Sequence, residues 1–541
     1  MTASSEFASR TGQDAAPAET GQSGTRAPRR WWVGAVWWVA GTAVLFGCYL
    51  RLAGTRAVNS DGASQALQSW DMLHGNLLLH GWGLTDVSFY TTELPQYMLV
   101  ELIRGFNADV VHVAAAMTYT LVVVLAALLA KGTATGRAAV ARVLVTAGIM
   151  LAPQLGGGTD VLLSSPDHIG TTVPVLVVLL VLDRARPRWY VPVLAGLVLG
   201  WATVADALVL YIGVLPLALV CAARVVRSVV AEKQPVKSQW YPLSLGAAAV
   251  AGGIAGQLAL RLIESHGGFR TWAPIAKLAA PGVLPHHLRV AAEGLLLLGG
   301  ADTVGRPVTP STAFLVLHLV GVVLAGCAVL FAAWRFLRGI SLVDQVLVAG
   351  VVINLAAYVI STQASDVIFT REIDAVLPFS AVLAGRLLAE RLVAARLGPV
   401  LLLVLAGYLG GLGYEVAQPS VPAQNQQLAS WLGSHHLRTG LSGYWEANVV
   451  TLASSDTVQV RQLTVSGGRV VPYHTEYNAA WYDPHRSSAN FVVLAPVTAT
   501  GYPGFTNEHA VLATFGPPAH VYHTGQYEVL VWNKNLLTEL R

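Results

Sequence analysis

Residues 31–62 read WWVGAVWWVAGTAVLFGCYLRLAGTRAVNSDG. The part from 31 to 50 carries no charged side chain and has the length that a transmembrane helix requires. Its tryptophans near the start are typical of an anchor at the membrane interface. The preceding residues, 1–30, are rich in Ser, Thr, Gly, Ala and Pro, so we expect a disordered cytoplasmic tail.

The composition extends this prediction to most of the chain. Of 541 residues, 54% are hydrophobic and only 12% are charged, whereas a soluble domain usually carries about 25% charged residues. Apolar runs bounded by Arg or Lys recur along the sequence. We therefore predict a polytopic α-helical membrane protein with about eleven spans, near 31–50, 110–130, 138–155, 169–183, 189–205, 207–223, 242–262, 313–334, 345–361, 374–390 and 398–415.

The distribution of Lys and Arg predicts the orientation in the membrane. With the N-terminus inside, the predicted inner loops are short and rich in these cations, and the outer loops are longer and poorer in them. The positive-inside rule then places the N-terminus in the cytoplasm and the C-terminus outside. Acidic residues gather in the outer loops, which indicates chemistry or recognition on that face, although the length of these loops explains part of the excess.

Three regions are distinguished within this topology: the tail 1–30, a transmembrane domain 31–417 and an extracytoplasmic domain 418–541. The first outer loop, 51–109, is long and contains a helix-like stretch at 63–79. A second amphipathic stretch, 288–298, is expected to lie on the same outer surface.

The composition changes near Gln418, which predicts a small soluble α/β domain. We expect helices at 424–438 and 510–515. Alternating segments predict strands at 448–452, 458–463, 490–494 and 527–532.

Asp61, directly after the first span, is the first candidate for chemistry. An ionised carboxylate at the membrane surface can accept a proton from an acceptor hydroxyl. The alternative is structural, because Ser60 and Asp61 are both good N-caps for the following helix.

The loop between the third and fourth spans supplies the second candidates, Asp160, Asp167 and His168. Its glycines allow it to fold closely over a ligand. Alternatively, Asp167 caps the next helix. His168 could bind substrate, but no His or Cys spacing in the sequence resembles a metal site.

Arg371 lies in an outer loop with no other cation, and a guanidinium is well suited to binding a phosphate. It could instead pair with Glu372 or Asp374, or reach lipid headgroups. Arg104 is a further candidate for the same phosphate, and Arg56 a weaker one.

Aromatic residues beside carboxylates often bind sugars. Tyr444, Trp445 and Trp481 of the C-terminal domain fit this pattern, although in a domain without cysteine they could equally form its core. Trp82 and Glu93 of the first outer loop are assigned to the same substrate-binding set. Nucleotide-binding glycine motifs and the zinc-protease His-Glu pair are absent from the sequence, and we expect no nucleic-acid partner.

These features together resemble the GT-C class of membrane glycosyltransferases over about residues 31–415. The first-loop sequence carries the resemblance through Asn59-Ser60-Asp61-Gly62, Trp70 and Gly75-Asn76-Leu77-Leu78 to Gly81-Trp82. The later segment Arg371 to Arg386, with Leu377-Pro378 and Leu383-Ala384-Gly385-Arg386, is similar to actinobacterial membrane proteins of that kind.

The resemblance implies a polyprenyl-phosphate-linked sugar donor and transfer of a hexosyl or pentosyl group, with inversion, to an extracytoplasmic glycan, lipid or protein of the cell envelope. By this resemblance, Asp61 matches the catalytic carboxylate of the first loop. Asp160 or Asp167 matches the acid of the second loop, and Arg371 matches the residue that neutralises the leaving phosphate. The first acid of the family is often followed by a second acid, whereas Gly62 follows Asp61 here. A need for Mg²⁺ or Mn²⁺ stays open.

Two other classes of function compete with this hypothesis: a non-enzymatic scaffold or receptor with an outer sensing domain, and a transporter of lipid or polysaccharide. The enzyme hypothesis requires Asp61, the 160–168 loop and Arg371 to meet in one site.

Overall fold

The computed structural model describes residues 31–151, 157–272, 276–303, 305, 307–308, 312–421, 424–496 and 504–540. The predicted disordered tail, 1–30, lies outside these residues. The chain forms two compact units, residues 1–43 and 44–541. The described part of the first unit is the beginning of helix α1 (Trp31–Ala53), and the second unit contains all the other elements.

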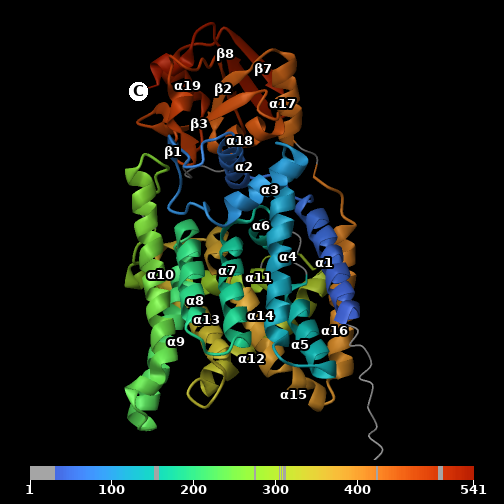
Figure 1. The fold of residues 1–541 in the computed structure, drawn as a ribbon. Helices are drawn as coiled ribbons and strands as arrows, with labels where there is room; N and C mark the ends of the chain where they lie inside the picture. Colours follow the sequence, from blue (N-terminus) through green and yellow to red (C-terminus); the bar gives the residue numbers. More distant parts are fainter. Residues whose placement is uncertain are drawn as a thin grey trace, which may run out of the picture. The chain divides into compact units, whose positions relative to one another are not determined.

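Each predicted span falls on a helix (Figure 1). These helices are α1, α4 (Asp109–Lys131), α5 (Gly136–Met150), α7 (Asp167–Arg184), α8 (Tyr190–Ala205), α9 (Leu215–Val226), α10 (Trp240–Ser265), α12 (Thr312–Arg335), α13 (Leu342–Ile360), α14 (Val376–Leu387) and α16 (Gly398–Val416). The π-helical turns η1 (Leu210–Val214) and η2 (Arg227–Ala231) extend α9 at both ends, and the 3-10 turn η3 (Val236–Gln239) precedes α10.

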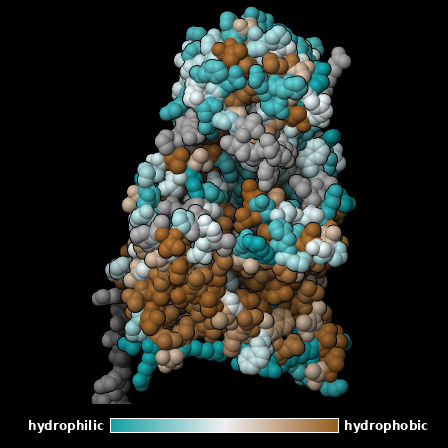
Figure 2. All heavy atoms as spheres, turned by 180° about the vertical axis from the view of Figure 1, so that it is seen from behind, coloured by the Kyte–Doolittle hydropathy of each residue, from teal (hydrophilic) through white to brown (hydrophobic). Residues whose placement is uncertain are grey.

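Within the described residues, seven helices are long and apolar enough to cross a membrane: 32–53, 109–131, 210–231, 236–265, 312–335, 342–360 and 398–416. Helices α8 and α14 are apolar but shorter. The multispanning α-helical class is therefore confirmed, whereas the count of about eleven crossings stays a prediction. On the face shown in Figure 2, hydrophobic side chains form a band over the helices, with hydrophilic side chains beyond it.

Small residues allow α8 and α10 to cross closely. Gly196 and Gly200 of α8 face Gly252 and Gly256 of α10, and a Cβ at Gly200 would lie 2.8 Å from the carbonyl oxygen of Gly252. Paired glycines four residues apart are a common way to pack helices in membranes, where van der Waals contact replaces the hydrophobic effect.

The first loop forms two helices, α2 (Ser60–Leu73) and α3 (Glu93–Arg104). The helical periodicity at 63–79 predicted the first of them, although α2 ends well before Leu79. They pack with the start of α4 around a buried cluster that includes Leu94, Tyr97 and Val110. The other connecting elements are α6 (Gly157–Leu162), η4 (Pro281–Val283), α11 (Leu284–Leu298), η5 (Thr362–Ser365), η6 (Val367–Ile373) and α15 (Ala389–Ala394). Helix α11 confirms the helix predicted at 288–298.

The C-terminal region is an α/β domain built on a six-stranded sheet of order β4-β3-β2-β6-β8-β7. Strand β2 pairs in parallel with β3 and β6, and the other pairs are antiparallel. The strands are β2 (Thr439–Gly443), β3 (Gln459–Ser466), β4 (Arg469–Pro472), β6 (Phe491–Leu494), β7 (His520–Thr524) and β8 (Tyr527–Val531). Helices α17 (Gln424–Ser434) and α18 (Tyr444–Ala453) pack on one face of the sheet. Helix α19 (Glu508–Phe515) packs on the other, and the short turns η7 (Ala479–Tyr482) and η8 (Leu536–Glu539) complete the domain.

The strand predicted at 448–452 is wrong, because these residues lie in helix α18. Val449, Val450 and Thr451 favour a strand locally. However, α18 connects two parallel strands, and such a connection needs a crossover, usually a helix. The helix is buried on two sides, since Val450 packs on the sheet and Val449 packs on the first-loop cluster.

The C-terminal domain contacts the first loop directly. Strand β1 (Trp82–Gly83) pairs with β5 (Tyr477–Asn478), and the rings of Trp82 and Trp481 meet edge to face at 5.0 Å. The predicted boundary at 417/418 lies between α16 and α17, inside the second compact unit, and stays a prediction.

Candidate active site

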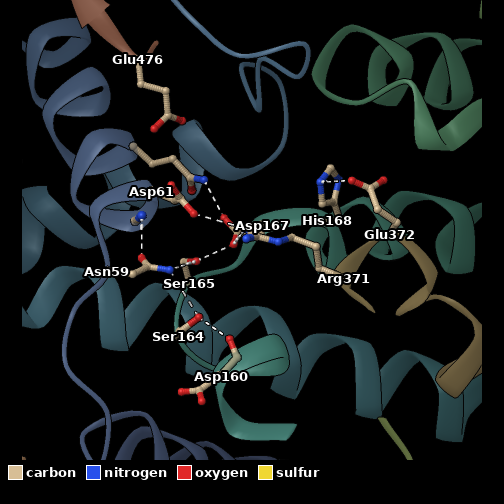
Figure 3. Close-up of polar contacts among 12 residues, drawn as sticks. Asn59, Asp61, Asp160, Ser164, Ser165, Asp167, His168, Arg371, Glu372 and Glu476 are labelled. Atoms are coloured by element: carbon tan, nitrogen blue, oxygen red, sulfur yellow. Dashed lines mark hydrogen bonds and ion pairs between the residues drawn. The ribbon is translucent and has the colours of Figure 1, made fainter. Parts of the chain in front are cut away.

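Asp61 lies in the first turn of α2 with its side chain directed into a polar cluster (Figure 3). The N-cap of α2 is Asn59, whose Oδ1 accepts a hydrogen bond from the Gly62 N–H at 2.8 Å. The structural alternative, in which Ser60 or Asp61 caps the helix, is therefore wrong. Asp61 is left available for other contacts.

Gly62 explains why Asp61 has no acidic neighbour. A Cβ at this position would lie 2.6 Å from Val111 Cγ1, closer than real Cβ atoms approach, and 3.1 Å from Ser165 Cβ, which is a tight contact. The helix α2 packs too tightly on α4 here to admit a second carboxylate. Position 62 therefore requires glycine, and Asp61 is the acidic residue at the start of α2.

Asp167 is the first residue of α7, and its carboxylate accepts several hydrogen bonds. Gln65 Nε2 donates to Oδ1 at 3.0 Å, and Ser165 Oγ donates to Oδ2 at 2.7 Å. The N-cap position belongs to Pro166, so Asp167 does not cap the helix. Its φ of 23° is strained for a residue with a side chain, and such strain is concentrated at functional sites.

Arg371, in η6, joins the two acids. Its Nη1 lies 3.2 Å from Asp61 Oδ2 and 3.2 Å from Asp167 Oδ2. Burial by itself would lower the pKa of the Arg371 guanidinium, but the charges of Asp61 and Asp167 raise it above its ordinary value. The side chains of Arg371 and Asp61 remain 27% and 20% exposed, which leaves this ion pair within reach of a ligand.

Tyr444, predicted to bind substrate, contacts Asp61 directly. Its hydroxyl lies 2.6 Å from Asp61 Oδ1, and it also hydrogen-bonds with Glu476 Oε2. The Ser60 hydroxyl donates to the backbone carbonyl of Tyr444, which fixes the start of α18 against α2. The C-terminal domain thus supplies part of the site around Asp61.

His168 supports the segment that carries Arg371. Its Nδ1 lies 2.7 Å from Asp206 Oδ2, and its Nε2 lies 3.5 Å from Glu372 Oε1. Both ring nitrogens are therefore engaged by carboxylates of the protein, which argues against the predicted contact with substrate. Glu372 pairs with His168 and leaves Arg371 to the two aspartates.

Asp160 and Arg104 lie in other ion pairs. Asp160 pairs with Arg56 at 3.0 Å, and Arg104, at the end of α3, lies 3.9 Å from Asp109. Neither of these ion pairs includes Arg371. Asp167 is thus better placed than Asp160 for the second-loop acid, and Arg371 better than Arg104 for a phosphate.

The remaining predicted substrate-binding residues have packing roles. Trp82 is buried, donates from Nε1 to Asp71 at 2.7 Å and contacts Trp481, whose ring lies 4.1 Å from the Arg461 guanidinium. Trp445 contacts the ring of Tyr444 edge to face at 5.1 Å. Glu93 is buried against Gly170 of α7, and burial raises its pKa well above the ordinary range.

Three residues of the cluster escaped prediction: Gln65, Ser165 and Glu476. A signal existed for Gln65, because it follows Asp61 by four residues and so shares its helical face. Ser165 lies beside Asp167 in the sequence. Nothing in the local sequence around Glu476 distinguishes it, since its role arises from the contact between the C-terminal domain and α2.

Across the described part of the chain, no group of three or more His, Cys, Asp or Glu side chains is arranged to hold a metal ion. The cation at the centre of the acidic cluster is the Arg371 guanidinium. A requirement for Mg²⁺ or Mn²⁺ therefore stays open.

Comparison with solved structures identifies the fold. ArnT from Cupriavidus metallidurans bound to undecaprenyl phosphate matches 92% of this chain and 98% of its own length, with a TM-score of 0.54 and 14% identity. The chain has a GT-C-type fold. ArnT in the apo state gives the same result, with a TM-score of 0.51, 13% identity and coverage of 94% and 99%.

A weaker likeness, to the oligosaccharyltransferase of Archaeoglobus fulgidus in the apo form, has a TM-score of 0.46 and 13% identity over 86% of this chain and 70% of that one. No family model matches the sequence, and no curated protein matches it significantly. The predicted GT-C-like architecture is confirmed at the level of the fold. The roles of Asp61, Asp167 and Arg371 within the GT-C fold stay predictions.

Proposed function

We propose that this chain is a membrane glycosyltransferase that transfers a sugar from a polyprenyl-phosphate-linked donor to an extracytoplasmic acceptor. One observation carries the proposal: Arg371 Nη1 lies 3.2 Å from both Asp61 and Asp167, although these residues are 310 and 204 positions away in the sequence. The GT-C-type fold adds support, since one ArnT structure of this fold has undecaprenyl phosphate bound.

Asp61 is the general base in this proposal. The acceptor hydroxyl gives its proton to an Asp61 oxygen as its own oxygen forms a bond to the anomeric carbon. The bond between that carbon and the phosphate oxygen breaks, and the phosphate leaves with the electron pair. A single displacement of this kind inverts the configuration at the anomeric carbon.

Arg371 stabilises the negative charge that develops on the leaving phosphate. In the structure its guanidinium is held between two carboxylates. Of the two, Asp167 is the more firmly fixed, because Gln65 and Ser165 also bind it. We infer that Asp167 keeps Arg371 in place when the donor phosphate takes over its contact with Asp61.

The substrate classes in this proposal are those that the resemblance to GT-C glycosyltransferases implies. The donor carries a hexosyl or pentosyl group on a lipid in the membrane, so a nucleotide-binding site is not required. The acceptor is a glycan, lipid or protein of the cell envelope. The distribution of Lys and Arg places the site on the outer face, with the N-terminus in the cytoplasm.

The test compares Asp61→Asn with the unchanged protein, purified in detergent and supplied with polyprenyl-phosphate-linked hexose and pentose donors. We expect Asp61→Asn to lower kcat/KM by about 10²–10⁴-fold, the usual contribution of a general base. Undecaprenyl phosphate should still bind to this variant. The matched control is Asp109→Asn, because Asp109 also lies in the first turn of a helix but is 73% exposed.

Arg371→Lys tests the phosphate contact in the same assay. Lysine keeps the positive charge but cannot reproduce the fixed geometry of a guanidinium, so we expect a loss of about 10²–10³-fold in kcat. Arg289→Lys, at an exposed residue of α11, is the control. Transfer by Asp61→Asn at the rate of the unchanged protein would remove Asp61 as the base.

A further inference from the structure

The Tyr444 hydroxyl lies between two carboxyl groups that come from different parts of the fold. Asp61 Oδ1, on α2, is 2.6 Å from Tyr444 Oη, and Glu476 Oε2, in the C-terminal domain, is on its other side. Glu476 and Tyr444 are each only 4% exposed, so water does not supply these hydrogen bonds. Figure 3 shows the two acids, with Glu476 above Asp61.

Counting protons shows that one of the two acids is neutral. A phenol has a single O–H, and an ionised carboxylate has no proton to donate. Two hydrogen bonds between Tyr444 and two carboxyl groups therefore need a second proton, which one of the acids must carry. Asp61 lies beside the Arg371 cation, which favours its ionised form, so the proton belongs to Glu476.

The surroundings of Glu476 agree with this assignment. The titratable groups that face it are Asp61 on α2, Asp167 on α7, Tyr97 on α3, Tyr444 on α18 and Tyr473 after β4. None of them is a cation, so no opposite charge stabilises an ionised Glu476. The hydrogen bonds of Tyr444 and Ser64 favour the ionised form, but they are weaker than the effects of burial and of Asp61. Burial raises the pKa of Glu476 well above its ordinary value, and the charge of Asp61 raises it further.

The backbone holds Glu476 in this position. Its φ is 49°, in the left-handed region that a residue with a side chain rarely adopts. The side chains of Gln462 and Ser64 donate to its carbonyl oxygen at 3.3 and 3.4 Å, and strand β5 follows directly. A strained backbone held from two sides is typical of a functional position.

We propose that Glu476 is a positioning residue for the reaction: as a neutral acid it donates to Tyr444, so that Tyr444 donates its own proton to Asp61 and holds the base ionised and oriented. This inference rests on the proposed role of Asp61 and extends it, because the C-terminal domain then controls the base. A hydrogen bond donated to a carboxylate favours its ionised form, which is the form that a general base needs.

The proposal predicts a pH dependence in both directions. Loss of the Tyr444 hydroxyl removes a donor from Asp61, so Tyr444→Phe should move the acidic limb of kcat/KM to higher pH by about one unit. At alkaline pH, ionisation of Glu476 takes the Tyr444 proton away from Asp61. It also adds a negative charge near the donor phosphate, so kcat/KM of the unchanged protein should fall.

Glu476→Gln separates positioning from packing, because glutamine has the same size, can donate to Tyr444 and cannot ionise. We expect Glu476→Gln to keep kcat/KM within about threefold near neutral pH and to lose the alkaline fall. Glu476→Ala leaves the Tyr444 oxygen without its donor and the hydroxyl less firmly held, so it should lower kcat/KM near neutral pH, where Glu476→Gln does not. Glu528→Gln, on strand β8 of the same domain, is the matched control and should keep the unchanged profile.

Infrared spectroscopy provides a test that does not need turnover. At neutral pH the unchanged protein and Glu528→Gln should show the C=O stretches of several buried protonated carboxyl groups, Glu93 and Glu101 among them, and Glu476→Gln should lack one component of this absorption. Equal carboxyl C=O absorption in the unchanged protein and Glu476→Gln, or an alkaline limb in Glu476→Gln identical to that of the unchanged protein, would overturn the proposal. If Asp61→Asn is inactive while Glu476→Gln keeps the unchanged profile, only the positioning role fails and the glycosyltransferase proposal stands.

Discussion

The shared use of Arg371 by Asp61 and Asp167 is the central feature of this protein at the scale of single residues. Each of these residues could be selected from the sequence by its type and its place in a loop. Their chemistry depends on their contacts, since the two acids share one guanidinium and Tyr444 donates to the first of them. By contrast, histidine is a residue type that often binds substrate, but Asp206 and Glu372 contact the two ring nitrogens of His168.

Glu101 gives a prediction about stability at the same scale. This residue of α3 is buried, with Oε1 accepting from Ser69 Oγ at 2.9 Å, and burial raises its pKa from 4.5 to about 8. The folded state therefore holds a proton that the unfolded chain releases at lower pH. The corresponding stability is present below about pH 4.5 and is lost as the pH rises through about 8.

We expect the Tm of the detergent-purified protein to fall as the pH rises from about 5 to about 9, and to fall less in Glu101→Gln, which cannot ionise. Glu293→Gln, at a solvent-reachable residue of α11, should follow the unchanged protein. Parallel curves for the unchanged protein and Glu101→Gln would contradict a neutral buried Glu101.

At the scale of elements, the packing partner decides the conformation of a segment. Residues 448–452 have the β-branched composition of a strand but form part of α18, because the chain must cross between parallel strands β2 and β3. The crossover also places Tyr444, at the start of α18, against the start of α2. A strand here would not have brought that hydroxyl to Asp61.

The crossing of α8 and α10 is expected to be the most sensitive helix contact to added volume. A side chain at Gly200 would meet the backbone of Gly252, which cannot move aside as a flexible side chain can. We predict that Gly200→Leu destabilises the fold by at least about 1–3 kcal/mol, measured as a lower Tm and a lower yield of monodisperse protein.

Gly326→Leu is the matched control, since Gly326 also lies in a membrane helix, α12, and has open space around it. Equal Tm values for the two variants would show that α8 and α10 do not cross as closely as the structure indicates.

For the whole molecule, the contact between the C-terminal domain and the first loop completes the site. It consists of the β1–β5 pairing, the packing of α18 on α2, and the aromatic contact of Trp82 with Trp481. This contact surrounds Asp61 with groups from both regions. The domain is therefore expected to take part in the reaction, beyond any role in recognising partners.

Trp481→Ala tests the importance of this contact. Removing the ring loses the edge-to-face contact with Trp82 and the stacking of Arg461, at a cost of about 1.4 kcal/mol, so sugar transfer should fall about tenfold. Binding of undecaprenyl phosphate should change little, because Arg371 is not involved. Tyr522→Ala, on edge strand β7 of the same domain, is the control. A loss of lipid binding as large as the loss of transfer would argue against a role confined to the C-terminal domain.

The sequence by itself determined the multispanning class, the approximate residue ranges of the apolar helices and the α/β nature of the C-terminal domain. These properties are local, because an apolar run or an alternating segment carries its own preference for burial wherever it lies in the chain. The residue types of the candidate site were visible for the same reason. Asp61 is recognisable because it follows the first apolar run closely, and Arg371 because its predicted loop has no other cation.

Only the tertiary structure decided which candidates meet. Asp61 and Arg371 are 310 positions apart, and no local pattern encodes a contact over that distance. Three further features depend on how the helices and the C-terminal domain pack. They are the N-cap role of Asn59, the ion pairs of Asp160 and Arg104 with other residues, and the contact of Glu476 with Tyr444. The physical reason is that burial and charge pairing set the behaviour of an ionisable group, and both are properties of its three-dimensional neighbours.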